Sequence, residues 1–274
     1  MSDFLHQAII KEYCKSLRTP RISAEYPRFV REATENGWSY EEFLQRLLEE
    51  ELNARQDSVA QRRLKEAKFP EIKTLDQVDW DELRGVSRPA IQQLATCGFI
   101  DAGEDIILAG PIGTGKTMLS IALGVEAARR RYRVAFCRAA ELVRELREAT
   151  TEHRLGRLQR RYQKVDLLVL DELGFVPFDK QGGELLFNLL SDRYERKSTI
   201  VSTNLSFGEW VQVFGCEKLT TARVLSAGVR TFGEIGASRL ELTPPLRSSK
   251  ASSPPELVQR LSDSAATCSD SRTG

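Results

Sequence analysis

Two short segments of this sequence combine the residue types that hold a polyphosphate. The first, GPIGTGKT at residues 110–117, fits the pattern G-x-x-x-x-G-K-[ST] completely. In such a loop backbone N–H groups surround the anion, Lys116 reaches the β and γ phosphates, and Thr117 offers its hydroxyl to Mg²⁺. The second segment is the acidic pair Asp171 and Glu172, directly after the apolar run LLVL. Together they predict a site for a nucleoside triphosphate and Mg²⁺.

The residues around the loop can be assigned separate roles. We expect Asp171 to hold Mg²⁺ with Thr117, Glu172 to polarise the attacking water, and Asn204 to orient that water near the γ-phosphate. Each motif has an alternative without a site: a glycine-rich turn that binds nothing, an acidic pair that only caps a loop, and an asparagine that only forms a turn. The combination of the three motifs disfavours these alternatives. The predicted nucleotide contacts are Gly110, Pro111, Ile112, Gly113, Thr114, Gly115, Lys116, Thr117 and Met118.

The surrounding pattern predicts the elements that position these residues. Apolar runs at 106–109, 133–138, 165–170 and 198–203 read as strands, and helical segments alternate with them at 118–131, 139–150, 153–164 and 182–196. Continuously apolar strands that alternate with helices indicate a parallel sheet covered on both faces. Helices at 3–18, 23–36 and 40–68 precede this α/β part. We therefore expect an N-terminal helical region (1–68), an α/β domain (69–242) and a disordered tail rich in Pro and Ser (243–274).

Two basic helical segments are candidates for DNA contacts. Arg154, Arg157 and Arg161 fall on one stripe of the 153–164 helix, and Tyr162 beside them is available for base stacking. Arg62 and Arg63 lie on the 40–68 helix. A solvated helix face is the alternative for both segments.

Composition limits the other classes of function. The net charge is +1, with 40 basic and 39 acidic residues, so nucleic-acid binding requires a local patch. The five cysteines are widely separated and form no CxxC pair, which indicates a reducing compartment without a disulfide framework or zinc site. A signal-peptide core and a membrane-spanning apolar run are both absent from the pattern. These features predict a cytoplasmic protein without membrane contact.

Longer segments resemble a known family. The order of phosphate loop, acidic strand and strand ending in Asn matches ATPases of the AAA+ superfamily. SYEEFLQRLLEEELNAR, RRLKEAKFPEIKTLDQVDW, LAGPIGTGKTMLSIALG, VDLLVLDELGFVPFD, GGELLFNLLSDRYERKSTIVSTNLSFGEWVQVFG and KLTTA resemble IstB-like ATPases, which are transposase helper proteins of bacterial insertion sequences related to the DnaC helicase loader. The resemblance spans roughly residues 4–221.

The resemblance implies a AAA+ P-loop ATPase core, Mg-dependent ATP hydrolysis and the site residues given above. It further implies a homo-oligomer on duplex DNA, with low sequence specificity, that recruits or stimulates the transposase of the same insertion element. Two alternatives stay open. One is a DnaC-like adaptor that binds a replicative helicase, and the other is a nucleotide-dependent scaffold with little turnover.

The sequence departs from the family pattern near its carboxyl end. Relatives continue after KLTTA with a Leu-Leu-Asp-Arg-Leu segment, whose arginine is expected to act on the ATP of a neighbouring subunit. Here residues 223–230 read RVLSAGVR, and a minor departure is Met118, where relatives commonly have His. We interpret the carboxyl end as altered, which would weaken hydrolysis and spare ATP binding. The candidates for a trans-acting arginine are Arg193, Arg196, Arg223 and Arg230.

Overall fold

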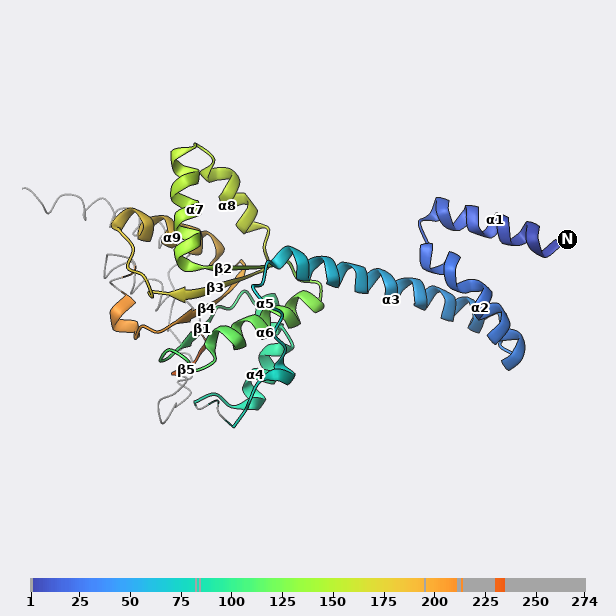
Figure 1. Ribbon diagram of the computed structural model, residues 1–274, viewed down its shortest axis with the longest axis horizontal. Helices are drawn as coiled ribbons and strands as arrows, with labels where there is room; N and C mark the ends of the chain where they lie inside the picture. Colours follow the sequence, from blue (N-terminus) through green and yellow to red (C-terminus); the bar gives the residue numbers. More distant parts are fainter. Residues whose placement is uncertain are drawn as a thin grey trace, which may run out of the picture. The chain divides into compact units, whose positions relative to one another are not determined.

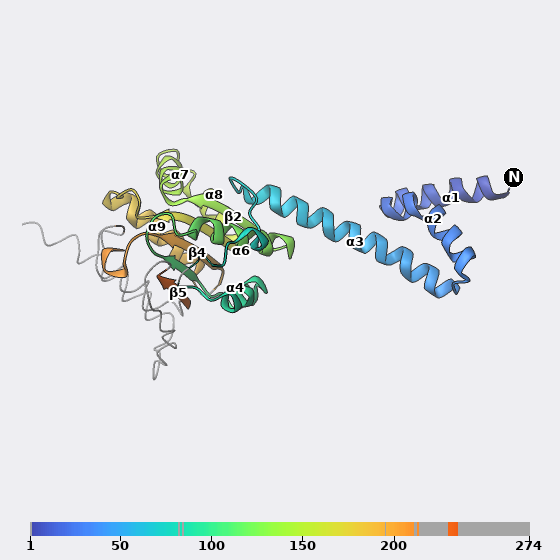
Figure 2. The same ribbon diagram turned by 60° about the horizontal axis from the view of Figure 1, so that its bottom comes forward.

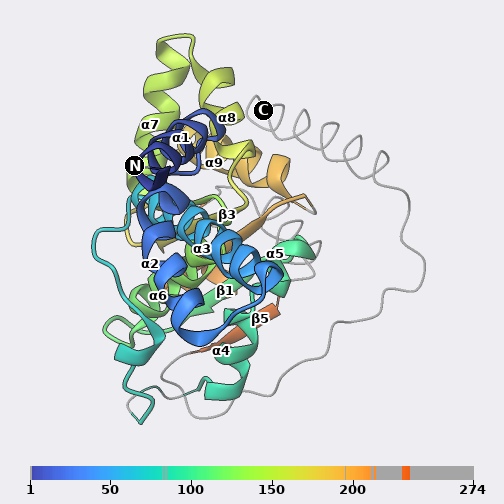
Figure 3. The ribbon, with the colours of Figure 1, turned by 90° about the vertical axis from the view of Figure 1, so that its right-hand side faces the viewer.

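A five-stranded parallel sheet forms the centre of the α/β part. The computed structural model describes residues 2–81, 83, 85–194, 196–210, 213 and 230–234. The strands are β1 (Ile106–Ala109), β2 (Val134–Arg138), β3 (Leu167–Leu173), β4 (Ser198–Thr203) and β5 (Arg230–Glu234), in the order β2-β3-β4-β1-β5 (Figure 1). Figure 3 shows β1, β3 and β5 of this sheet from the side. The four predicted strands are confirmed. The edge strand β5 was not predicted, and β3 continues past residue 170, so that Asp171 and Glu172 belong to it.

Helices cover both faces of the sheet, as predicted (Figure 1). Successive strand residues point to opposite faces. Ile107, Leu168 and Val201 therefore pack with α7 (Ala139–Thr151), α8 (Leu155–Gln163) and α9 (Lys180–Arg193). Their neighbours Ile106, Leu167 and Ile200 pack with α4 (Arg88–Ala95), α5 (Gly98–Asp101) and α6 (Lys116–Arg129). Two short 3₁₀ turns, η1 (Leu75–Gln77) and η2 (Phe207–Trp210), lie in the connections.

The chain begins with three long helices, as the sequence predicted: α1 (Ser2–Leu17), α2 (Pro20–Asn36) and α3 (Tyr40–Ala67). The second begins at Pro20, earlier than predicted, because proline suits the first turn of a helix. Its end is set by Gly37, whose φ is 64°. The Ser39 hydroxyl then caps α3 by accepting the N–H of Glu42 at 3.1 Å.

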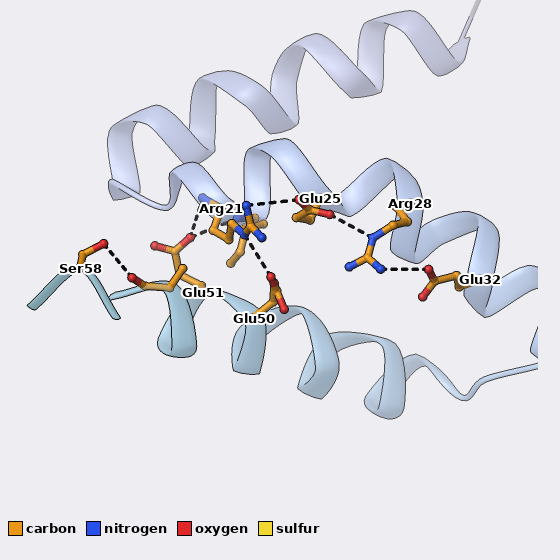
Figure 4. Close-up of polar contacts among 9 residues, drawn as sticks. Arg21, Glu25, Arg28, Glu32, Glu50, Glu51 and Ser58 are labelled. Atoms are coloured by element: carbon orange, nitrogen blue, oxygen red, sulfur yellow. Dashed lines mark hydrogen bonds and ion pairs between the residues drawn. The ribbon is translucent and has the colours of Figure 1, made fainter. Parts of the chain in front are cut away.

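A buried carboxylate joins α3 to the start of α2 (Figure 4). Oε2 of Glu51 accepts the backbone N–H groups of Arg21 at 2.9 Å and Ile22 at 3.1 Å, and its Oε1 accepts Nε of Arg55 at 2.8 Å. Arg55 also donates to the carbonyl of Arg18 at the end of α1, 2.5 Å away. The Glu51 side chain therefore accepts backbone N–H groups that have no partner within α2. Through Arg55 it also links the end of α1 to the start of α2.

The last turns of α3 pack beside α6 (Figures 1 and 2). Ala67 is buried in the same core as β1 and β3, with Leu64 and Phe69 packed against it. A Cβ at Gly124 of α6 would lie 2.9 Å from the Phe69 ring, so a larger residue at this position would displace the ring. The predicted domain boundary at residue 68 falls at the end of α3 and remains a prediction, and the predicted tail at 243–274 lies outside the described residues. None of the described helices is long and apolar enough to cross a membrane.

Candidate nucleotide-binding site

The loop of residues 110–117 connects the buried strand β1 to helix α6. Gly113 and Gly115 have φ values of 84° and 83°, which glycine adopts without steric cost. The N–H of Gly110 donates to the carbonyl of Thr203 at 3.2 Å and fixes the loop to the end of β4. Because Gly115 is the N-cap of α6, the partial positive charge of that helix end lies at the loop. This is the geometry of an anion-binding turn.

Lys116 is almost entirely buried, with 9% of its surface exposed. Its Nζ donates to the carbonyl of Pro111 at 2.6 Å and to the hydroxyl of Thr114 at 3.3 Å. Burial lowers the pKa of Lys116, and the negative charge of Asp171 opposes that shift. The ammonium group is therefore positioned inside the loop, where a phosphate group would strengthen its charged form.

Thr117 and Asp171 lie in contact, as the sequence predicted. Oγ1 of Thr117 donates to Oδ1 of Asp171 at 2.9 Å, and only 1% of Asp171 is exposed. The Ser202 hydroxyl donates to the same carboxylate oxygen and accepts the N–H of Glu172 at 3.0 Å. Oxygen ligands of this kind suit Mg²⁺. The pair would hold the ion beside the phosphates, and the ion would neutralise their charge.

Ser202 was not predicted as a site residue. It belongs to β4, which lies between β1 and β3 in the sheet. Polar residues at the carboxyl ends of adjacent parallel strands meet at one edge of the sheet. The polar run Ser202, Thr203 and Asn204, at the end of the predicted strand 198–203, was therefore the feature of the sequence that indicated Ser202.

Glu172 sits at the same edge in an uncommon backbone conformation, with a φ of 58°. Its side chain is exposed, and its Oε2 lies 3.5 Å from Nε of Arg138. Arg138 ends β2 directly opposite Asp171 in the strand register. The sequence did not single out Arg138, because the order of strands that brings it to Glu172 is a property of the folded sheet.

Asn204 is exposed at the first position after β4. The preceding residue, Thr203, lies opposite Ala109 in the register, directly before the loop. The hydroxyl of Thr203 donates to the carbonyl of Leu173 at 2.7 Å and accepts the N–H of Leu205 at 3.1 Å. These bonds hold the Asn204 backbone at the phosphate-loop edge, at the end of the strand that lies between β1 and β3.

Arg193 cannot act on a neighbouring subunit, so this candidate was wrong. Only 1% of it is exposed, and its guanidinium donates to the carbonyls of Tyr162, Val165 and Ser198. Arg196 is exposed just after α9. The backbone of Arg230 begins β5 opposite Ile106, at the amino edge of the sheet. Arg223, with most of the atypical 223–230 segment, lies outside the described residues.

Tyr162 is also not available for the role predicted from sequence. Only 3% of it is exposed, and its hydroxyl donates to Oε2 of Glu145 at 3.1 Å, so base stacking by its ring is excluded in this fold. Burial raises the pKa of its phenol. The three arginines of the predicted stripe, Arg154, Arg157 and Arg161, are exposed. Arg154 pairs with Glu152, and Arg161 pairs with Glu145 at 2.9 Å.

Arg62 and Arg63 differ in accessibility. The side chain of Arg62 is exposed and lies 3.7 Å from Glu66. The side chain of Arg63 is mostly covered, and it donates to Glu66 at 2.7 Å and to the carbonyl of Arg131 at 3.3 Å. Arg63 therefore has a structural role at the junction of α3 and α6, in addition to its charge.

Residues 13–226 match the family model described as IstB-like ATP binding protein. The chain belongs to the IstB-like ATP-binding protein family. Among the relatives of this IstB-like chain, the ATP-binding protein of insertion sequence IS5376 from Geobacillus stearothermophilus is 38% identical over 78% of this chain and 85% of its own length. The ATP-binding protein of insertion sequence IS21 from Pseudomonas aeruginosa is 36% identical over 75% of this chain and 78% of its own length.

A solved structure resembles the fold of this IstB-like protein. AMPPCP-bound DnaA from Aquifex aeolicus gives a TM-score of 0.50 at 22% sequence identity, over 60% of this chain and 51% of that one. Together with the parallel sheet covered by helices, this confirms the predicted AAA+ fold class. The family assignment confirms the predicted resemblance.

Proposed function

We propose that this protein binds ATP with Mg²⁺ at residues 110–117 and hydrolyses it. The 2.9 Å hydrogen bond between Thr117 and Asp171, beside a complete phosphate loop, is the observation that carries the proposal. The loop N–H groups and Lys116 bind the phosphates, and Thr117 and Asp171 hold Mg²⁺.

The acidic residue next to this pair would serve hydrolysis. Glu172 accepts a proton from water as the water oxygen bonds to the γ-phosphorus and the bond to the ADP oxygen breaks. Asn204 orients that water at the same edge of the sheet. In this proposal Glu172 needs to turn away from Arg138, which is its partner at 3.5 Å.

We infer that ATP binding supports assembly of several copies on duplex DNA and recruitment of a transposase. Family membership and the insertion-sequence names of the relatives support this inference. Exposed arginines on α8, and Arg62 on α3, supply cationic side chains for phosphate contacts. An arginine of the neighbouring copy would complete the ATP site, and Arg196, Arg223 and Arg230 remain the candidates.

The test measures ATP turnover and sedimentation of the purified protein with and without duplex DNA. The proposal predicts that DNA raises turnover and that ATP with DNA produces larger assemblies. Lys116→Ala should lose nucleotide binding and assembly, because it removes the buried ammonium group from the loop. Lys180→Ala, which changes an exposed lysine at the start of α9, is the matched control. If DNA changes neither turnover nor assembly size in the unmodified protein, the proposed assembly on DNA is wrong.

A capture experiment tests the partner. The proposal predicts that the ATP-bound protein on DNA retains a transposase of the same insertion element. Retention of a replicative helicase, and not of the transposase, would favour the helicase-loader alternative instead.

A further inference from the structure

A cluster of arginines lies where the end of α3 meets the end of α6. Helix α6 ends at Arg129, and Arg130 and Arg131 follow it in the turn that leads to β2. The side chain of Arg63, near the end of α3, donates to the carbonyl of Arg131 at 3.3 Å. This bond joins two segments that are distant in sequence. We call the five residues Arg62, Arg63, Arg129, Arg130 and Arg131 the basic cluster.

The surface at the cluster is hollowed. A hollow of about 450 Å³ is lined by Gln56, Asp57 and Ala60 of α3, by Thr96, and by Arg129–Tyr132. Tyr132 is fixed in this wall by donating its hydroxyl hydrogen to Asp101 at 2.8 Å. The surface at the basic cluster is therefore concave, and a hydrogen bond holds one of its lining residues in place.

The acidic residues nearby balance only part of the cluster. Arg62 and Arg63 share Glu66, and Arg129 pairs with Glu126 at 2.8 Å. Arg130 and Arg131 are exposed, and neither forms an ion pair within the described part of the chain. Two positive charges at this surface thus form no ion pair with a described residue, although Asp57 lines the same hollow and Asp101 binds Tyr132 in its wall.

The end of α6 explains part of this arrangement and leaves two exposed guanidinium groups without an ion-pair partner of their own among the residues that the structure describes. A cation in the last turn of α6 interacts favourably with the helix dipole, and Arg129 occupies that turn. Arg131 follows the C-cap Arg130, and its φ of 75° ends the helix, because its N–H donates to the carbonyl of Ala128 at 2.9 Å and the N–H of Tyr132 donates to that of Ala127 at 3.1 Å. The helix end therefore explains the backbone of Arg131, whereas its exposed guanidinium is available to a polyanionic ligand.

We propose that the basic cluster binds the phosphate backbone of duplex DNA. This proposal rests on the proposed function, in which the protein assembles on DNA, and it adds Arg129–Arg131 as the contact surface. The cluster precedes Val134, so it lies at the amino edge of the sheet, whereas the phosphate loop follows the carboxyl end of β1. DNA and ATP would therefore occupy opposite edges without competing for the same groups.

The test compares duplex DNA binding of three double variants by fluorescence anisotropy over a range of salt concentrations. Arg130→Gln with Arg131→Gln removes the two unpaired charges. Arg130→Lys with Arg131→Lys keeps them. Arg28→Gln with Arg144→Gln removes the same charge from exposed arginines elsewhere, and it is the control.

The glutamine pair should bind DNA roughly 10- to 50-fold more weakly near physiological salt, with a salt slope reduced by about 2, because about 0.9 of the slope is lost per phosphate contact. The lysine pair and the control should keep the slope of the unmodified protein. Nucleotide affinity and the midpoint of thermal unfolding should be unchanged in all three. If the glutamine pair does not fold, Arg130→Gln alone should reduce the slope by about 1.

The outcomes separate this inference from the proposed function. A glutamine pair that binds DNA with the slope and affinity of the control would overturn the role of the basic cluster while leaving DNA binding intact. Failure of the unmodified protein to bind duplex DNA under any salt condition would overturn both.

Discussion

Nε of Arg138 lies 3.5 Å from Oε2 of Glu172, so the carboxylate proposed to polarise water is paired with the end of the neighbouring strand. Both side chains are about half exposed. An exposed ion pair of this kind contributes about 0–1 kcal/mol. The pair can therefore hold Glu172 away from the phosphates, and breaking the pair costs little free energy.

Arg138→Gln should raise kcat for ATP hydrolysis by up to about fivefold, because it removes a competing partner worth at most about 1 kcal/mol. ATP affinity should be unchanged, since Arg138 does not contact the loop of residues 110–117. Steady-state turnover and a nucleotide titration measure the two effects. Arg147→Gln is the control, because Arg147 forms a similarly exposed pair with Asp179 at 3.3 Å. A fall in kcat of more than about tenfold would show instead that Arg138 assists the chemistry directly.

Tyr162→Phe should leave DNA affinity unchanged, because the hydroxyl that it removes donates to Glu145 within the fold and is not available to DNA. The variant loses the hydrogen bond to Glu145, which costs about 1 kcal/mol of the free energy of unfolding and a few degrees in Tm. Anisotropy with duplex DNA and thermal unfolding measure the two properties. Tyr40→Phe changes a residue that is 92% exposed, and it should alter neither. Weaker DNA binding by Tyr162→Phe with an unchanged Tm would contradict this assignment.

Glu51→Gln should lower the free energy of unfolding at neutral pH by about 1–3 kcal/mol, since it weakens hydrogen bonds to a buried charged group. Burial raises the pKa of Glu51, but hydrogen bonds from Arg55, Ile22 and Arg21 outweigh it, and its pKa in the folded protein is lowered. A lowered pKa contributes stability that is present above the unfolded pKa and is lost as the pH falls through the folded pKa.

The difference between the original protein and Glu51→Gln should therefore shrink as the pH falls below about 4.5. Denaturant unfolding at a series of pH values measures this difference. Glu35→Gln, at an exposed position of α2, is the control and should show a small difference at every pH. A Glu51→Gln difference that stays constant from neutral to acid pH would mean that the carboxylate charge does not contribute.

The phosphate loop was predictable from sequence because its function requires particular residues at fixed spacing. Gly113 and Gly115 adopt positive φ, and Lys116 must follow them directly. The strand at 106–109 and the strand at 198–203 were predictable for a similar reason, since a sheet buried on both faces needs apolar runs.

Other features depend on contacts that the local pattern does not contain. β5 reads RTFGE, without an apolar run, and only its pairing with β1 identifies it as a strand. Arg193 resembles any surface arginine at the end of a helix, yet its guanidinium donates to the carbonyls of the distant residues Tyr162 and Val165 and of Ser198. Arg138 reaches Glu172 because β2 and β3 are neighbours in the sheet, which a sequence of alternating strands and helices leaves open.

The most direct test of the account replaces Glu172 with Gln and measures ATP binding and ATP turnover in the presence of duplex DNA. The variant keeps the loop, Lys116, Thr117 and Asp171, so ATP affinity should match that of the original protein. Turnover should fall by at least about a hundredfold, because the group that accepts the proton from water is lost. Unchanged affinity with abolished turnover is the predicted result. Turnover equal to that of the original protein would contradict the central claim that this edge of the sheet is the site of ATP hydrolysis.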